Sequence, residues 1–110
     1  YKKVLIQMLD YEEANVRWDA AIALAKMGDK SGIDIIINLL DRKYYDSYPS
    51  MKDGSGVDRD ESDNSIYTAI AISQILIDLR LKEKLIYLAE NDKNVKIREF
   101  ALKTLNGYYK

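Results

Sequence analysis

With 110 residues, of which 47% are hydrophobic and 32% are charged, the chain has the composition of one folded domain with a modest core. No run approaches the ~20 apolar positions that a membrane-spanning helix needs. The formal net charge of -1 gives no overall attraction to nucleic acid, and the absence of cysteine and histidine excludes disulfides, thiol nucleophiles and Cys/His zinc sites. We therefore expect no catalytic residue, no metal and no cofactor.

The first 41 residues carry apolar side chains at helical spacing. A short helix is expected over residues 4–9. Asn15 is suited to cap a second helix, which Gly28 ends by supplying a left-handed residue. Ser31 is suited to cap a third helix that runs to about Asp41. These segments predict three helices in the first part of the chain.

The second and third helices differ in how their side chains are distributed. The second is apolar on two sides, which is typical of a helix held between neighbours, so we expect Trp18 in the core. The third is rich in isoleucine but carries a polar stripe at helical spacing, formed by Asp34, Asn38 and Asp41. This stripe favours a helix over a strand and marks the solvent side of that helix.

The helical pattern stops over residues 42–63, which we interpret as a long inserted loop. It opens with Tyr44, Tyr45 and Tyr48, and Pro49 follows. Tyrosine combines a large contact area with a polar tip, as at binding hot spots, so these three residues are candidates for partner contact. The acidic residues of the loop lack the order and spacing of an EF-hand, and no metal site is predicted there.

The second part of the chain returns to helical spacing. We expect a long helix that Asn64 or Ser65 caps and that runs to Leu79. A further helix is expected over residues 81–90. A turn then leads to a last helix that ends near Gly107.

Two segments of the chain share one pattern at a distance of 81 residues. Residues 16–24 and 97–105 each read hydrophobic-Arg-x-x-Ala-x-x-x-Leu, with Arg17 and Arg98 at the second position. The distance is about two helical-repeat periods of roughly 40 residues. A middle unit, residues 66–90, fills the gap but lacks the arginine.

Residues 16–29 read Val-Arg-x-x-Ala-x-x-x-Leu-x-x-x-Gly-Asp and precede an isoleucine-rich helix. This pattern resembles the HEAT-like repeats of the phycobilisome-lyase type. The resemblance implies an all-α chain that folds as an α-α superhelix of about two and a half helix pairs, with the second (B) helix of each pair lining a concave face. It also identifies Arg17, Asp29 and Arg98 as motif positions, which we expect to bond to helix ends and turns. We expect a single domain over residues 1–110 that is a piece of a longer array.

On this arrangement the stripe of Asp34, Asn38 and Asp41 faces the groove. Its counterpart on a later B helix is Lys82 or Glu83, Tyr87 and Glu90, and together the two sets predict a mixed, mildly acidic concave surface. The sequence therefore favours a protein–protein interaction scaffold that uses this face and the tyrosine-bearing loop. A protein partner is expected, end-to-end self-association is open, and a cytoplasmic location is the default expectation.

Two other functions stay open. A nucleic-acid-binding module would use the basic residues near the last helix, which are Lys93, Lys96, Arg98 and Lys103. An accessory domain of a lyase-like enzyme would need a small-molecule pocket, and no sequence motif indicates one.

Overall fold

The computed structural model describes residues 2–47 and 62–109, and the described part of the chain is helical, without a strand. The all-α fold is therefore confirmed, and its packed helices agree with a HEAT-like repeat. Six α-helices and two short 3₁₀ helices follow one another along the chain: α1 (Lys2–Met8), α2 (Ala14–Lys26), η1 (Lys30–Gly32), α3 (Ile33–Leu39), η2 (Arg42–Ser47), α4 (Ser62–Ser73), α5 (Leu79–Asn91) and α6 (Val95–Tyr108).

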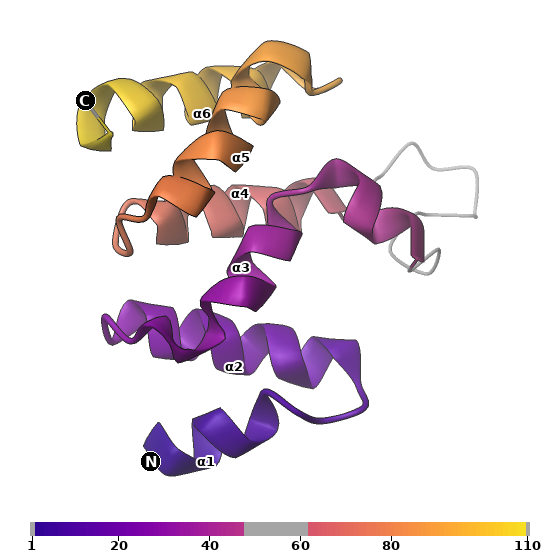
Figure 1. The fold of residues 1–110 in the computed structure, drawn as a ribbon. Helices are drawn as coiled ribbons and strands as arrows, with labels where there is room; N and C mark the ends of the chain where they lie inside the picture. Colours follow the sequence, from indigo (N-terminus) through magenta and orange to yellow (C-terminus); the bar gives the residue numbers. More distant parts are fainter. Residues whose placement is uncertain (1, 48–61, 110) are drawn as a thin grey trace.

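The helices form two layers, and the Cα positions extend over 40 × 37 × 16 Å. In Figure 1, α2, α4 and α6 lie one above another and run across the view, while α3 and α5 cross in front of them. We call α2, α4 and α6 the A layer. The helices α1, α3 and α5 make up the B layer, because each precedes an A helix and the hollows described below join α1 to α3 and α3 to α5.

The core lies between the two layers. Every helix after α1 contributes to one continuous cluster of buried apolar side chains, with a smaller cluster of Leu5, Ala20 and Leu24 between α1 and α2. Trp18 belongs to the larger cluster and is only 6% exposed, which confirms the expectation that it lies in the core. Gly32 lies against α2 at a point that has no room for a side chain, since a Cβ atom there would lie 2.9 Å from the Cα atom of Ala21.

Equivalent hydrogen bonds fix the register of the repeats. Arg17 Nη1 donates to the carbonyl of Tyr11, and Arg98 Nη1 donates to that of Asp92, so each arginine binds the turn six residues before it. Asp29 and Asp78 share a second pattern, in which the carboxylate accepts a hydrogen bond from the amide two residues later. Asp78 lies 49 positions after Asp29, and this offset relates α2 to α4.

A chain of ion pairs follows the same repeat along one edge of the slab. Lys2 contacts Asp29 at 2.7 Å, and Lys30, one repeat later, contacts Asp78 at 3.6 Å. Lys2 lies at the start of α1, and Lys30 lies in η1, just before α3. Each lysine contacts the aspartate in the turn that follows the next A helix. The middle repeat therefore keeps the aspartate at its usual place, although Ile77 stands where the first repeat has Gly28.

The ends of several helices differ from those expected. Gly28 has a φ of 79° and ends α2 as predicted. Asn15 is wrong as a cap, because α2 begins one residue before it. Asp29, not Ser31, caps the short η1 that precedes α3, and its carboxylate accepts the Ser31 amide at 2.7 Å.

The second half needs two corrections of the same kind. The helix α4 begins at Ser62, before Asn64 and Ser65, and it ends at Ser73 instead of continuing to Leu79. The chain then turns, and Asp78 caps α5 by accepting the amide of Arg80 at 2.8 Å. Ile75 and Ile77 are about half exposed in this turn, which explains why an apolar run here does not extend the helix.

The predicted loop over residues 42–63 is too long at both ends. Residues 42–47 form η2, and residues 62 and 63 already belong to α4. The Asp41 carboxylate accepts the Lys43 amide at 3.0 Å and thereby supports the start of η2. The remaining positions of the predicted loop, including Tyr48, lie outside the described residues.

Candidate protein-binding surface

The polar stripe expected on the third helix lies on the surface of the B layer. Asp34 and Asn38 are exposed on α3, and Asp41 follows the helix and is partly exposed. The other side of α3 packs against η2 and α4 through Tyr45 and the buried isoleucines. Of the predicted site residues, these three are brought to one face.

Cationic side chains of α5 face this stripe. Arg80 Nη1 lies 3.5 Å from Asp34 Oδ1, and Lys84 Nζ lies 3.3 Å from Asp41 Oδ2. Both pairs are open to water, which screens them, so they contribute little to the stability of the fold. Both charges are therefore present on this face.

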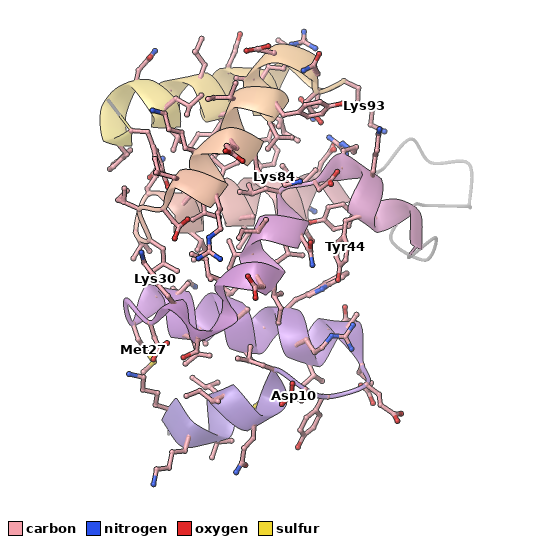
Figure 2. The ribbon with its side chains drawn as sticks, viewed as in Figure 1. Asp10, Met27, Lys30, Tyr44, Lys84 and Lys93 are labelled. Atoms are coloured by element: carbon pink, nitrogen blue, oxygen red, sulfur yellow. The ribbon has the colours of Figure 1, made fainter. Side chains whose placement is uncertain are left out.

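A hollow of about 340 Å³ opens between α3 and α5. We call it the α3–α5 hollow, and it is lined by Leu40, Asp41, Lys43, Glu83, Lys84 and Tyr87. Tyr87 is 54% exposed, so its ring contributes apolar area at the rim while its hydroxyl stays in water. Figure 2 shows Lys84 on α5 close to the end of α3. Two predicted site residues, Asp41 and Tyr87, thus line one hollow.

A second hollow, of about 310 Å³, lies on the other side of α3. Ile6, Leu9 and Asp10 of α1 and its following turn face Gly32, Asp34 and Ile35. The carboxylates of Asp10 and Asp34 make its polar part acidic. Because Asp34 lines this hollow and Asp41 lines the α3–α5 hollow, the predicted stripe runs from one to the other along α3.

The tyrosines of the predicted loop do not form an exposed cluster. Tyr45 is fully buried, and its hydroxyl donates to the carbonyl of Leu39 at 2.6 Å. Burial raises the pKa of this phenol far above 10. Tyr45 is thus wrong as a surface contact, because η2 folds its ring under α3 and into the core.

Tyr44, which is labelled in Figure 2, belongs to η2 and is partly buried beside Tyr45. Its ring centroid lies 5.7 Å from that of Tyr45 and 6.1 Å from that of Trp18. The Trp18 indole also donates to the Tyr44 hydroxyl at 3.3 Å. These three rings anchor η2 on α2, so at most the outer edge of Tyr44 is open to a partner.

The motif residues bond within the fold. Arg17 donates to two carbonyls of the turn before α2, at 2.7 Å each. Arg98 makes the equivalent bond before α6. The hydrogen bonds from Lys2 and Ser31 lower the pKa of Asp29 to about 2, so its carboxylate stays charged in ordinary buffers.

Arg42 forms a buried ionic centre that the sequence did not indicate. Its guanidinium donates two hydrogen bonds to the Asp92 carboxylate, from Nε to Oδ1 at 3.1 Å and from Nη2 to Oδ2 at 2.9 Å. It also donates a hydrogen bond to the Asp63 carboxylate. The Asp92 side chain is 1% exposed. Burial opposes the charge on Arg42, but the hydrogen bonds to the two carboxylates outweigh it and raise the pKa of Arg42 above its usual value. Partners 21 and 50 residues away leave no signal in local spacing.

Residues 16–42 match the sequence model for the PBS lyase HEAT-like repeat. This stretch is a HEAT-like repeat. The match covers α2, η1 and α3, that is, one A helix and the B helix after it. Among the curated proteins and the solved structures, none matches the chain significantly. The HEAT-like stretch includes the whole stripe of Asp34, Asn38 and Asp41, whereas Tyr87 lies outside the matched residues.

Two searches of the described residues bear on the kind of site. Residues 2–47 and 62–109 hold no group of three or more acidic side chains arranged to bind a metal ion. Within the same ranges, none of the helices combines the length and the apolar character required to cross a bilayer. The polar groups of the B layer include charges of both signs, with Asp34 close to Arg80 and Asp41 close to Lys84.

Proposed function

We propose that the chain is a protein–protein interaction module and that its B layer holds the binding surface. The observation that carries this proposal is the α3–α5 hollow, where Tyr87 is 54% exposed above a rim of both charges. Tyrosine is enriched among the few residues that supply most of the binding energy in protein interfaces. The charges of both signs contribute orientation and specificity more than affinity.

The stripe on α3 extends this surface toward α1. A partner that fills the α3–α5 hollow lies beside the exposed Asn38 and reaches Asp34 at the second hollow. Because Arg80 and Lys84 are already close to Asp34 and Asp41, a partner exchanges these weak surface pairs for its own charges at little cost. The proposed contact set is therefore Asp34, Asn38, Asp41 and Tyr87, with the outer edge of Tyr44 beside it.

A pull-down from lysate of the source organism tests this proposal with a matched pair of variants. Tyr87→Ala removes the ring at the hollow, whereas Tyr11→Ala removes a ring that is equally exposed, at 54%, on the turn after α1. We expect the partner to be lost with Tyr87→Ala and kept with Tyr11→Ala, while both variants retain the far-ultraviolet circular dichroism of the wild type. Equal recovery by both variants contradicts the proposed site.

The same experiment separates the nucleic-acid alternative. Of its four basic residues, Lys93, Lys96 and Lys103 are exposed, while Arg98 is partly buried and bonds to the Asp92 carbonyl. Nucleic acid would be released steeply as salt rises, because counterions compete for phosphate contacts. Recovery that depends on nuclease treatment and on salt, but not on Tyr87, would favour that function instead.

A further inference from the structure

The A layer contains a third hollow, whose described lining comes mainly from α2 and α4. It measures about 460 Å³ and lies between α2 and α4, a volume within the usual range of ligand sites, about 300–1,000 Å³. We call it the α2–α4 hollow, and it is lined by Asn15, Trp18, Asp19, Ile22, Leu39, Asn64, Ser65 and Thr68. None of these residues belongs to the surface proposed above.

The repeat register explains why this space is open. The residues that approach each other between α4 and α6 are Tyr67 and Phe100, whose ring centroids lie 6.1 Å apart. The 49-residue offset places Trp18 at the position of Tyr67. The offset of 32 residues between Ala69 of α4 and Ala101 of α6 places Thr68 at the position of Phe100. Between α2 and α4, Thr68 therefore takes the place that Phe100 has between α4 and α6. The volume that a phenylalanine ring would fill beside Trp18 is left open.

The lining has the amphipathic character of a polypeptide site. Trp18, Ile22 and Leu39 form the apolar floor, with Trp18 and Leu39 almost fully buried. The carboxamides of Asn15 and Asn64 stand on opposite walls, at positions that the 49-residue offset makes equivalent. Each carboxamide both donates and accepts hydrogen bonds, as the amide and carbonyl of a peptide backbone require. Within the described residues neither carboxamide has a hydrogen-bond partner.

Asp19 sets the charge of the occupant. It is the charged residue of the described lining, it is exposed, and its carboxylate makes no ion pair within the described residues. A lysine or arginine can lay its aliphatic stem on the apolar floor while its charged head reaches this carboxylate. The same negative charge repels a phosphate backbone.

From this geometry we propose that the α2–α4 hollow is a second binding site, which takes an extended segment of a partner protein through a lysine or arginine side chain. The stem covers Trp18 and Ile22, the cationic head pairs with Asp19, and the segment's backbone bonds to Asn15 and Asn64. This site is independent of the α3–α5 hollow, so the two proposals can fail separately.

Thr68→Phe is the decisive variant, because it places at this interface the residue that the chain itself has at the equivalent position of α6. The ring occupies the hollow, and Thr68 is exposed, so the helix α4 keeps its buried face. Circular dichroism and thermal unfolding check that the variant folds. Asp19→Asn provides a second variant that keeps the shape of the side chain and removes only its charge.

A phage-displayed library of random dodecapeptides, selected on the whole chain and counter-selected on Thr68→Phe, supplies the probe. The single tryptophan of the chain lies in the hollow, so binding of the synthetic peptides is read as a change in its fluorescence. We expect the selected peptides to share a lysine or arginine. Asp19→Asn, and replacement of that lysine by norleucine, each weaken binding by about fivefold, the upper end for an exposed ion pair.

Tyr87→Ala should leave the affinity of these peptides unchanged, which separates this site from the B-layer surface. The proposal is overturned if no selected peptide discriminates against Thr68→Phe, if the discriminating peptides lack a basic residue, or if Asp19→Asn binds them as tightly as the wild type does.

Discussion

Arg42→Met removes the cation at the centre of the only interaction described above that ties three separate segments together. The Asp92 carboxylate that remains is 1% exposed and loses two of its hydrogen bonds, keeping the bond from the Asn94 amide. Removing one member of a buried ion pair costs about 3–5 kcal/mol, because the other charge stays uncompensated. Since the Arg42 side chain is 18% exposed, water can reach the site, and we expect about 3 kcal/mol.

That loss is a large part of the total stability of a small domain, which is about 5–15 kcal/mol. Urea unfolding followed by circular dichroism at 222 nm should show a lower midpoint with an unchanged slope, and the melting temperature should fall by about 13 °C. Arg80→Met is the matched control, because the Arg80 side chain is 56% exposed and water screens its ion pairs, so we expect little change in stability. Equal effects of the two substitutions would refute the assignment of Arg42 as a buried link.

Three further outcomes follow from the contacts. Gly32→Ala should lower the free energy of unfolding by about 1–3 kcal/mol in urea denaturation, because the added Cβ atom would clash with α2. Gly107→Ala should raise the free energy of unfolding by up to about 1 kcal/mol in the same assay, because a Cβ atom there has no other atom within 4 Å and alanine favours the helix. Tyr45→Phe should cost about 1–2 kcal/mol in thermal unfolding, because a buried carbonyl loses its donor; no change would contradict that bond. The carboxylates of Asp29 and Asp78 should titrate near pH 2 by NMR, and because both pKa values are lowered on folding, their contribution to stability is present above pH 3.8 and disappears as the pH falls toward 2.

The helical part of the fold could be predicted because apolar spacing and glycine chemistry are local. Gly28 ends α2 with a positive φ, and the apolar faces of the helices meet in one core. The end of α4 could not be read in the same way. Ile75 and Ile77 continue an apolar run beyond Ser73, yet they lie half exposed in a turn whose course Asp78 determines.

The site was predictable only where it lies on regular helices. Helical spacing placed Asp34 and Asn38 on one face of α3, and the structure keeps them there. The prediction that Tyr45 is a surface contact was wrong because no sequence periodicity marks η2. The burial of its ring depends on tertiary packing against Trp18 and α3. The α2–α4 hollow was missed because Thr68 becomes informative only after the register to α6 is known.

The burial of Tyr45 in η2 determines how the segment predicted as a loop, residues 42–63, can be tested for a role in partner binding. Replacing residues 43–61 would remove Tyr44 and Tyr45 together with the described η2, so a lost partner would report on the fold. Replacing residues 48–61 alone leaves the ring cluster on Trp18 intact. We expect that version to keep its helical circular dichroism, and any change in partner recovery then reports on the replaced positions, Tyr48 included.

Photo-crosslinking in the source cells tests most directly the claim that the B layer binds a protein. The photoreactive residue p-benzoylphenylalanine is placed at Tyr87 in one version of the chain and at Tyr11, which is equally exposed, in the other. The proposed function predicts a discrete adduct from position 87 that is absent from position 11 and is lost when Asp41 and Glu83 at the hollow are replaced by lysine. Adducts that are the same from both positions, or that persist after those replacements, would contradict it.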